Sequence, residues 1–188
     1  MIISAKKILE LNKEHNIIQN LAERELHPEG AGFDIRVEEV FKLEGSGFLG
    51  VEERDTPDAK KAADIKDGDS DYTLNPGEYV LVKTVEQINL PGSKIEVSGK
   101  KMFLSAHVYP RSTLQRSGVM LKTTKTDPGY SGELTFGMFN AGPCPFRFEL
   151  GSRIANIVFM EVHGDLAREY AGQWKGGRVS TEGKETQN

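Results

Sequence analysis

Apolar residues near the N-terminus recur at roughly helical spacing over residues 4–26, and Ser4 stands where a helix N-cap is favoured. A histidine, a proline and a glycine within residues 27–30 end this pattern. The spacing therefore predicts a short N-terminal helical segment, residues 1–27.

From Phe33 onward the pattern changes to short apolar or alternating runs that are separated by glycine and proline. Such runs are typical of strands, and no long helical segment falls between them. The pattern predicts a mainly β chain with an antiparallel sandwich or barrel, and it argues against a parallel sheet with crossover helices. The runs are FDIRVEEVFKL, EYVLVKTVEQINL, KIEVSGKKMFLSAHV, SGVMLKT, GELTFGMFN, FRFELG and RIANIVFMEV.

Two segments lack this strand pattern. Residues 52–71 contain few large apolar residues and a dense mixture of charges, which predicts an exposed loop. The tail, residues 170–188, is rich in Gly, Lys, Ser, Thr and Glu, and we expect it to be mobile. We interpret the whole chain, residues 1–188, as one domain, because this length supports a single core.

Acidic residues in and after the charged segment partly match a calcium-binding loop. Asp67, Asp69, Asp71 and Glu78 occupy the first, third, fifth and twelfth positions of that template. However, Tyr72 stands where the loop needs a glycine, and neither flank has a helical pattern. We therefore favour a solvated acidic loop and predict no metal-ligating residues.

Composition places the chain among ordinary globular proteins. It has 24 basic and 28 acidic residues and a formal net charge of -4, which argues against nonspecific binding to nucleic acid. No apolar run approaches the roughly 20 residues of a membrane-spanning helix, and the N-terminus lacks the pattern of a secretory signal. With a single cysteine, Cys144, we expect a cytoplasmic protein without a membrane or nucleic-acid partner.

Two short segments are candidates for chemistry. Arg111 and Ser112 follow HVYP, where a guanidinium fork and a hydroxyl can converge on phosphate oxygens. Taken alone, this pair is more typical of a surface turn. Asp127 begins an Asp-Pro-Gly sequence, which by itself predicts only a hairpin.

In their order along the chain, five segments resemble motifs of the dUTPase and dCTP deaminase superfamily, in its archaeal-type dUTPase branch of dCTP deaminase-like proteins. The resemblance implies a distorted antiparallel, jelly-roll-like fold of the dUTPase type. It also implies a homotrimer with active sites at the subunit interfaces. The segments are GAGFDIRV, YPRSTLQRSGV, TDPGYSGELTF, GSRIANIVF and YAGQWKGGRVSTEG.

The resemblance also assigns roles to individual residues. Asp127 matches the carboxylate that orients and activates a water for attack on the α-phosphorus, and Tyr130 matches the aromatic ring that stacks on deoxyribose. Mg²⁺ is expected on the triphosphate. The remaining substrate-binding residues that the resemblance implies are Arg111, Ser112, Arg116, Asn156, Lys175 and Arg178.

One residue of the deaminase branch is missing. The glutamate that shuttles protons in dCTP deaminases is replaced by Gly137, which can neither activate water nor protonate a leaving amine. Glu133 lies four residues earlier on the same strand, about 13 Å away. We therefore predict a dUTP diphosphatase. The alternatives are a dCTP deaminase, with or without diphosphatase activity as well, and a nucleotide-binding homologue that has lost catalysis.

Several departures from the family pattern leave the base preference open between uracil and cytosine. Asn156 stands where the fourth motif usually has glutamine, and Thr126 where an isoleucine commonly precedes the aspartate. The hairpin from Val119 to Asp127 is shorter than in either branch. Trp174 fits two interpretations equally, stacking over a nucleotide or packing on a neighbouring subunit.

Overall fold

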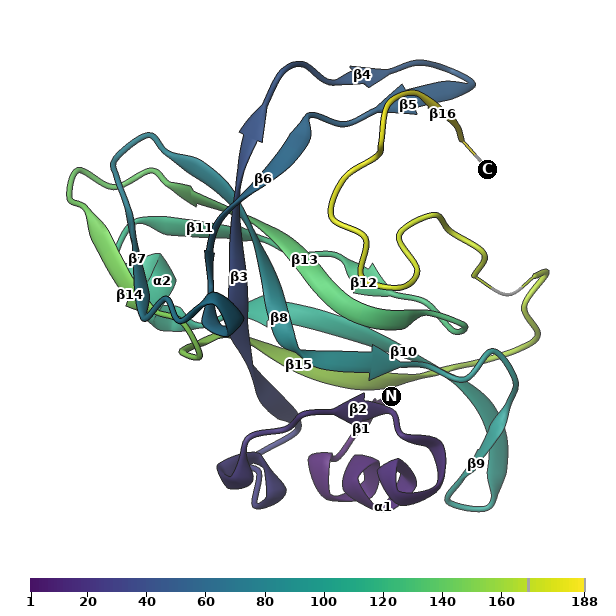
Figure 1. The fold of residues 1–188 in the computed structure, drawn as a ribbon. Helices are drawn as coiled ribbons and strands as arrows, with labels where there is room; N and C mark the ends of the chain where they lie inside the picture. The colour runs from purple at the N-terminus through teal and green to yellow at the C-terminus, as the bar shows by residue number, and fades with distance from the viewer. Residues whose placement is uncertain (169, 188) are drawn as a thin grey trace.

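The structure, a computed structural model, describes residues 1–168 and 170–187. Its largest sheet is antiparallel and curled (Figure 1), which confirms the predicted mainly β, jelly-roll-like fold. Its strands, in spatial order, are β11 (Val119–Lys122), β13 (Ser131–Asn140), β8 (Tyr79–Asn89), β3 (Gly32–Glu44), β15 (Arg153–Val162), β10 (Lys100–Pro110) and β12 (Lys125–Thr126).

Shorter elements surround this sheet. The strands that pair with it are β1 (Ile2–Ile3) on β15, β2 (Ile18–Gln19) on β8, β6 (Asp58–Asp64) on β3 and β9 (Ile95–Val97) on β10. Two small sheets contain β14 (Phe146–Glu149) with β7 (Asp71–Leu74), and β16 (Glu185–Thr186), β5 (Glu53–Asp55) and β4 (Phe48–Leu49). The helices are α1 (Ala5–His15), α2 (Ser112–Arg116) and the 3-10 turns η1 (Glu23–Leu26) and η2 (Ile65–Asp67). In the described part of the chain, no helix has the length and apolar character needed to cross a membrane.

Alternating side chains explain why the predicted runs form a sheet. In β8, every second residue from Val80 to Ile88 is buried, while the residues between them are partly exposed. Successive side chains of a strand point to opposite faces, so this alternation buries one face and leaves the other accessible. The buried face of β8 carries two polar residues, Thr84 and Glu86.

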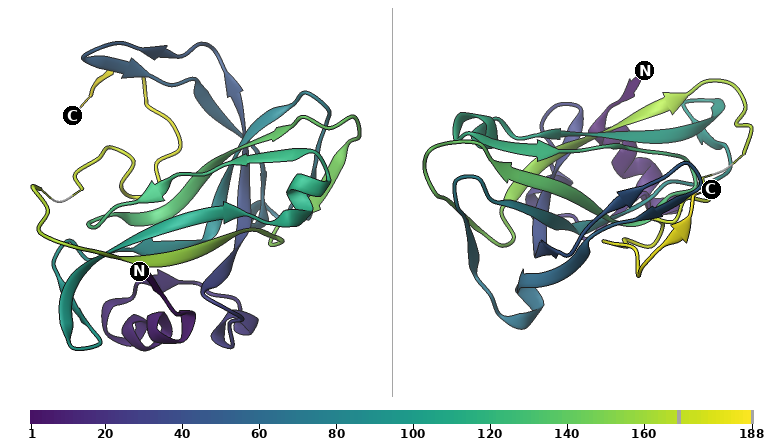
Figure 2. Two further views of the ribbon diagram at one scale, coloured as in Figure 1. Left: turned by 180° about the vertical axis from the view of Figure 1, so that it is seen from behind. Right: turned by 90° about the horizontal axis from the view of Figure 1, so that it is seen from above.

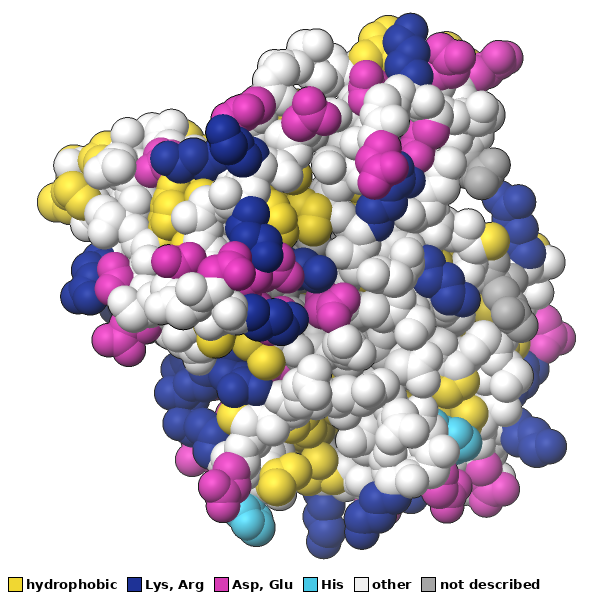
Figure 3. Space-filling view, in the orientation of Figure 1, with side chains coloured by type: hydrophobic (Ala, Val, Ile, Leu, Met, Phe, Trp, Pro, Cys, Tyr) yellow, Lys and Arg dark blue, Asp and Glu magenta, His cyan; other side chains and the backbone are white. Residues whose placement is uncertain are grey.

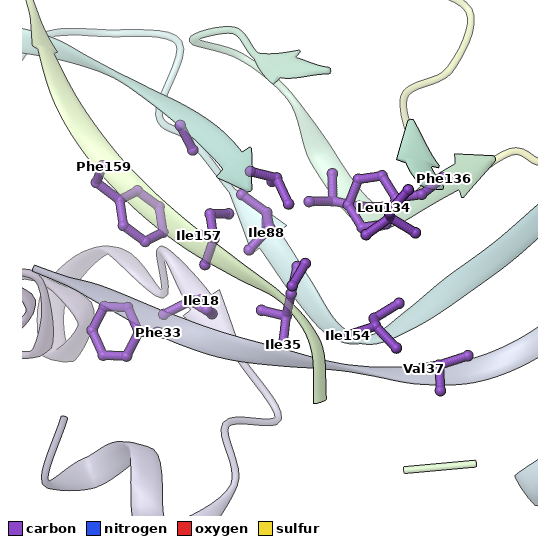
Figure 4. Packing of buried hydrophobic residues seen from close by; sticks show 14 of the residues in the cluster. Ile18, Phe33, Ile35, Val37, Ile88, Leu134, Phe136, Ile154, Ile157 and Phe159 are labelled. Atoms are coloured by element: carbon purple, nitrogen blue, oxygen red, sulfur yellow. The ribbon is translucent and has the colours of Figure 1, made fainter. Parts of the chain in front are cut away.

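Aromatic and aliphatic side chains from neighbouring strands fill the core. Phe33 of β3 and Phe159 of β15 are fully buried and meet edge to face, with ring centroids 6.2 Å apart. Figure 4 shows these rings in one cluster with Ile18, Ile88 and Ile157. An edge-to-face pair adds about 0.5–1.5 kcal/mol beyond the burial of its area.

The predicted helix over residues 4–26 is too long. Ser4 caps α1 as expected, but the helix ends at His15 because Asn16 adopts a left-handed conformation, with φ of 48°. The Asn12 side chain then bonds both the N–H and the carbonyl of Ile18, at 2.8 and 2.9 Å. These bonds fix the chain in the extended conformation of β2, which continues the sheet.

The prediction of a loop over residues 52–71 is also wrong, because the segment contains β5, β6 and η2. Strand β6 pairs with β3 from Asp58 to Asp64, and most of its side chains are exposed. Backbone pairing with β3 therefore stabilises a strand whose own sequence shows no apolar alternation. On the face in Figure 3, basic and acidic side chains lie close to one another. Two ion pairs of this segment are Lys66 with Glu38 and Lys61 with Asp64.

Candidate active site

A tight turn between β12 and β13 carries Asp127. The Tyr130 N–H donates to the Asp127 carbonyl at 3.1 Å, while Gly129 and Tyr130 exchange backbone hydrogen bonds with Leu90 at 2.9 and 2.8 Å. These bonds fix the turn on the Leu-Pro segment that follows β8. The Asp127 side chain keeps 36% of its surface exposed, and its Oδ1 lies 2.5 Å from the Lys125 ammonium.

Tyr130 is held in one orientation beside this turn. Its hydroxyl donates to the Glu133 carbonyl at 2.5 Å, and its ring packs at 5.9 Å from that of Tyr170. Burial raises the pKa of the Tyr130 phenol, so the hydroxyl keeps its proton and this hydrogen bond well into the alkaline range.

Asp127 and Tyr130 lie on the wall of a largely apolar cavity of about 380 Å³. The strands contribute aliphatic and aromatic side chains, and the C-terminal tail closes one side. A second cavity, of about 290 Å³, shares Asp127 and Tyr170 with the first and includes Arg168. The residues that line the first cavity are Leu43, Thr56, Pro57, Leu81, Thr124, Lys125, Thr126, Asp127, Tyr130, Leu134, Thr135, Phe136, Tyr170, Trp174, Arg178 and Val179.

The tail lies against the start of β13, as the two views in Figure 2 show together with Figure 1. The Gly176 N–H donates to the Ser131 carbonyl at 2.6 Å, and the Tyr170 N–H donates to the Pro128 carbonyl at 3.1 Å. Gly132 permits this approach, because a Cβ there would lie 2.7 Å from the Gly176 carbonyl carbon. The tail is thus folded over the cavity in the structure, and its mobility in solution stays a prediction.

The tail residues proposed from sequence occupy different positions. Arg178 and Trp174 both line the first cavity, so one cation and one indole ring face the space beside Asp127. Lys175 is exposed, and it belongs to the same turn of the tail. In this single chain, Trp174 packs on the Arg54 guanidinium, at 4.8 Å from the ring centroid.

A second group of proposed residues gathers around Asp34, away from the cavity. The Asp34 carboxylate accepts hydrogen bonds from Arg111, from Arg153 at 2.8 Å and from the Asn156 amide at 3.1 Å. Its backbone N–H donates to Glu25 at 3.0 Å, which fixes the strand beneath it. Two guanidinium groups around one carboxylate leave net positive charge and unused donors that suit phosphate oxygens.

Ser112 and Arg116 belong to α2, the helix that directly follows Arg111. Both side chains are exposed, and each stands within five residues of Arg111. Arg153 is a member of the group around Asp34 that the sequence did not single out, although it lies three residues before Asn156 in the fourth motif. The spacing alone carried no sign that both side chains share Asp34 as a partner.

The register of β10 separates the two groups. Thr126, just before Asp127, pairs with Ala106, whereas Asn156 pairs with Tyr109. The two positions are therefore three residues apart along β10 and two strand spacings apart across the sheet, roughly 14 Å in total. One phosphate cannot contact Asp127 and Asn156 of the same chain.

Gly137 and Glu133 occupy different surroundings on β13. A Cβ on Gly137 would lie 2.7 Å from Tyr79 Cζ, so the Tyr79 ring covers this position. The Glu133 carboxylate accepts a hydrogen bond from Gln87 at 2.7 Å and lies 3.8 Å from the Lys83 ammonium. Glu133 is thus held in a polar network on β8 and β13.

The four residues that partly match a calcium loop have separate partners. Asp67 lies 3.5 Å from Lys61, Asp69 accepts the Asp64 N–H, and Asp71 binds the Arg147 fork. Glu78 accepts a hydrogen bond from Tyr72 at 2.6 Å. Over residues 1–168 and 170–187, no group of three or more His, Cys, Asp or Glu side chains could hold a metal ion.

A model of the dCTP deaminase-like family matches residues 2–162, and the chain belongs to this family. A relative from Aeropyrum pernix, named probable deoxyuridine 5'-triphosphate nucleotidohydrolase, is 34% identical over 146 residues, which cover 78% of this chain and 83% of the relative. A deoxyuridine 5'-triphosphate nucleotidohydrolase from Methanocaldococcus jannaschii is 32% identical and covers 90% of this chain and 99% of its own.

Relatives from the other branch are also similar. A dCTP deaminase, dUMP-forming, from Aquifex aeolicus is 28% identical over 178 residues, covering 94% of this chain and 90% of its own. Among solved structures, 2'-deoxycytidine 5'-triphosphate deaminase from Agrobacterium tumefaciens superposes with a TM-score of 0.60 at 18% identity, over 84% of this chain and 46% of that one. That structural likeness shows the fold alone. The family and its named members support an enzyme of one of these two branches.

Proposed function

We propose that the chain is a dUTP diphosphatase, which hydrolyses dUTP to dUMP and pyrophosphate. The observation that carries this proposal is the placement of the Asp127 carboxylate on the wall of a largely apolar cavity that Tyr130 and Arg178 also line. Such a cavity suits a base and a deoxyribose. Asp127 supplies a carboxylate that can orient water, and Arg178 supplies positive charge for the phosphates, as hydrolysis of a phosphoanhydride bond needs.

In the proposed reaction, Asp127 orients a water molecule toward the α-phosphorus. A bond forms between the water oxygen and the α-phosphorus, and the bond from the α-phosphorus to its bridging oxygen breaks. Pyrophosphate leaves with that oxygen, and the proton of the water passes to the Asp127 carboxylate and then to solvent. Tyr130, fixed by its bond to Glu133, would stack on the deoxyribose and leave no room for a ribose 2'-hydroxyl.

Mg²⁺ would enter as part of the substrate. Because the described residues offer no cluster of metal ligands, we assign its ligands to phosphate oxygens and water. The ion neutralises charge on the triphosphate. Within the protein, Arg178 would supply positive charge beside the cavity.

We also propose a homotrimer. In it, the Asp34 group of one subunit, which consists of Asp34, Arg111, Arg153 and Asn156, faces the first cavity of the next subunit. This arrangement is supported by the strand register within one chain, which separates the backbone of Asn156 from that of Thr126, next to Asp127, by roughly 14 Å. Arg111, Ser112 and Asn156 of one subunit would then bind phosphates whose α-phosphorus lies at Asp127 of another. Arg116 would extend the same basic surface along α2. A cytoplasmic location remains our expectation from the single free cysteine, Cys144.

dCTP deamination is the alternative activity, because a relative of similar length carries that name. This reaction needs an acid where Gly137 lies under Tyr79, and Glu133 is engaged by Gln87 and Lys83. A homologue that only binds nucleotide is the remaining alternative.

The test is to incubate the purified protein and Mg²⁺ separately with dUTP, dCTP, dTTP and UTP. Chromatography of the nucleotides, with assays of pyrophosphate and ammonia, identifies each product. We expect dUMP and pyrophosphate from dUTP alone. Ammonia from dCTP would establish the deaminase, and tight binding without any product would establish the binding protein.

A further inference from the structure

Glu185, near the C-terminus, is held between two arginines from distant parts of the chain. Its Oε1 accepts a hydrogen bond from Arg54 Nε at 2.9 Å, and its Oε2 accepts one from Arg178 at 2.6 Å. Arg54 belongs to β5, in the charged segment, and Glu185 belongs to β16, which pairs with β5. The side chains of Arg54 and Glu185 are only 18% and 16% exposed.

This cluster adjoins the first cavity of the candidate active site. Arg178 lines that cavity, and Trp174, another lining residue, stacks on the Arg54 guanidinium at 4.8 Å. Thr56 and Pro57, which follow Arg54 closely, line the same cavity. Arg178 therefore faces the cavity, and Arg54 lies next to it, in contact with the lining residue Trp174.

The charges of this cluster favour an anion that carries more negative charge than a single carboxylate. Two guanidinium groups and one carboxylate leave one net positive charge, and the Arg178 side chain is 32% exposed and open to a ligand. Guanidinium forks match the oxygens of phosphate as well as those of carboxylate, and a phosphate carries more charge. A terminal phosphate can therefore take the place that the Glu185 carboxylate occupies.

We propose that Arg54 and Arg178 form a binding site for the terminal phosphates of the nucleotide, and that Glu185 occupies this site in the free protein. This inference rests on the proposed function, because it places the α-phosphorus at Asp127 and extends the phosphate chain along the cavity edge. A nucleotide with at least two phosphates displaces Glu185. A nucleoside monophosphate leaves Glu185 bound.

Calorimetric titration without turnover tests this site. The probes are dUMP, the non-hydrolysable triphosphate analogue dUpNHpp, and inorganic pyrophosphate. The variants are Arg54→Ala and Glu185→Gln, with Lys60→Ala and Glu182→Gln as matched controls on the exposed surface of β6 and of the tail. Arg54→Lys keeps the charge without the fork and replaces Arg54→Ala if the latter does not fold.

We expect Arg54→Ala to weaken dUpNHpp binding about tenfold or more, since charge-assisted hydrogen bonds are lost, and to leave dUMP binding within about twofold. Glu185→Gln should tighten dUpNHpp and pyrophosphate by about threefold to tenfold, because the competing charge is removed. Arg54→Lys should give an intermediate loss. The control variants should match the unmodified protein.

Two results would overturn the inference. One is an equal loss of dUMP and dUpNHpp affinity in Arg54→Ala, which would mean that Arg54 only supports the tail. The other is unchanged or weaker dUpNHpp and pyrophosphate binding in Glu185→Gln. Failure of the proposed function gives a different result, absence of dUTP hydrolysis, while pyrophosphate binding still reports on the two arginines.

Discussion

The Tyr79 ring covers Gly137 across the pair of strands β8 and β13. Gly137 pairs with Leu81, and a Cβ added to Gly137 would lie 2.7 Å from Tyr79 Cζ and would overlap the Tyr79 hydroxyl. By the resemblance of this chain to dCTP deaminases, Gly137 stands at the position of their catalytic glutamate. The ring therefore closes this place to a side chain, and the missing acid and the covering ring together favour the diphosphatase.

Gly137→Ala should lower the free energy of unfolding by about 1 kcal/mol, because the added methyl group displaces the Tyr79 ring. The double variant Gly137→Ala with Tyr79→Ala should lose less than the sum of the two single changes. Urea denaturation of all four proteins measures this coupling. Additive losses would show that the two side chains do not compete for the same space.

Asp127→Asn should lower kcat for dUTP by about a hundredfold or more, since the amide cannot accept the proton of the water. Binding of dUpNHpp should stay within about threefold, because the Asp127 carboxylate acts on the water. Steady-state kinetics and calorimetry measure the two quantities. Asp67→Asn, an exposed carboxylate on η2, is the control and should leave both unchanged. Full activity of Asp127→Asn would refute the assignment.

Mixing two variants, each of which we expect to lack dUTP hydrolysis, tests the proposed site between subunits. Arg111→Ala removes one of the two arginines around Asp34, and Asp127→Asn removes the carboxylate at the cavity. In mixed trimers, some interfaces combine the intact Asp34 group of one subunit with the intact Asp127 of another. We therefore expect co-refolded mixtures to recover part of the dUTP hydrolysis, up to about a quarter of normal at equal proportions. No recovery in a verified mixed trimer would place the whole site in one chain.

Gly132→Ala should detach the tail from β13. Gly132 has φ of 138°, and its Cβ would press against Gly176. We expect a loss of about 1–3 kcal/mol from backbone strain, with further loss of tail contacts. Trp174 is the only tryptophan, so its emission should shift to the red as the tail leaves the cavity.

The control for this prediction is Gly77→Ala, which shares a positive φ of 79° but has no neighbour within 4 Å of the added Cβ. This control should lose stability from backbone strain without changing the Trp174 emission. An identical spectrum for Gly132→Ala and the unmodified protein would contradict the role of Gly132 in tail packing.

The buried ion pair between Arg36 and Glu86 predicts that the free energy of unfolding of an Arg36 variant depends on pH. Arg36 donates to the Glu86 carboxylate from its backbone N–H and from Nε, both at 2.7 Å, and Glu86 has no exposed surface. Burial raises the pKa of the Glu86 carboxyl, while the bonds and charge of Arg36 oppose this rise. Arg36→Met should lower stability at pH 7 by about 3–5 kcal/mol, because an unpaired carboxylate remains buried.

The loss in Arg36→Met should shrink as the pH falls. A carboxyl with a raised pKa in the folded state binds its proton more tightly there than in the unfolded chain. Its contribution is therefore fully present below the unfolded pKa and is lost as the pH rises through the folded pKa. Denaturation of Arg36→Met and the control Lys60→Met between pH 4 and pH 7 measures this. A loss that grows on acidification would contradict the sign.

Local patterns in the sequence were enough to predict the type of fold and to propose Asp127 and Tyr130 as the centre of the site. Alternation in segments such as EYVLVKTVEQINL predicted β8, because burial of one sheet face imposes a period of two on the side chains. The motif around Asp127 and Tyr130 was also recognisable, since a turn and the residues next to it are close in sequence. These two side chains do line one cavity.

Contacts between distant segments became visible only in the folded chain. Strand β6 forms in a charged segment because β3 offers backbone partners, and no local apolar pattern records such a pairing. Asp34 accepts hydrogen bonds from Arg111 and Arg153, and Glu185 accepts one from Arg54. The partners in these pairs are 77 to 131 residues apart in the sequence. Contacts of this kind depend on strand order and register, which the sheet as a whole fixes and short stretches of sequence do not encode.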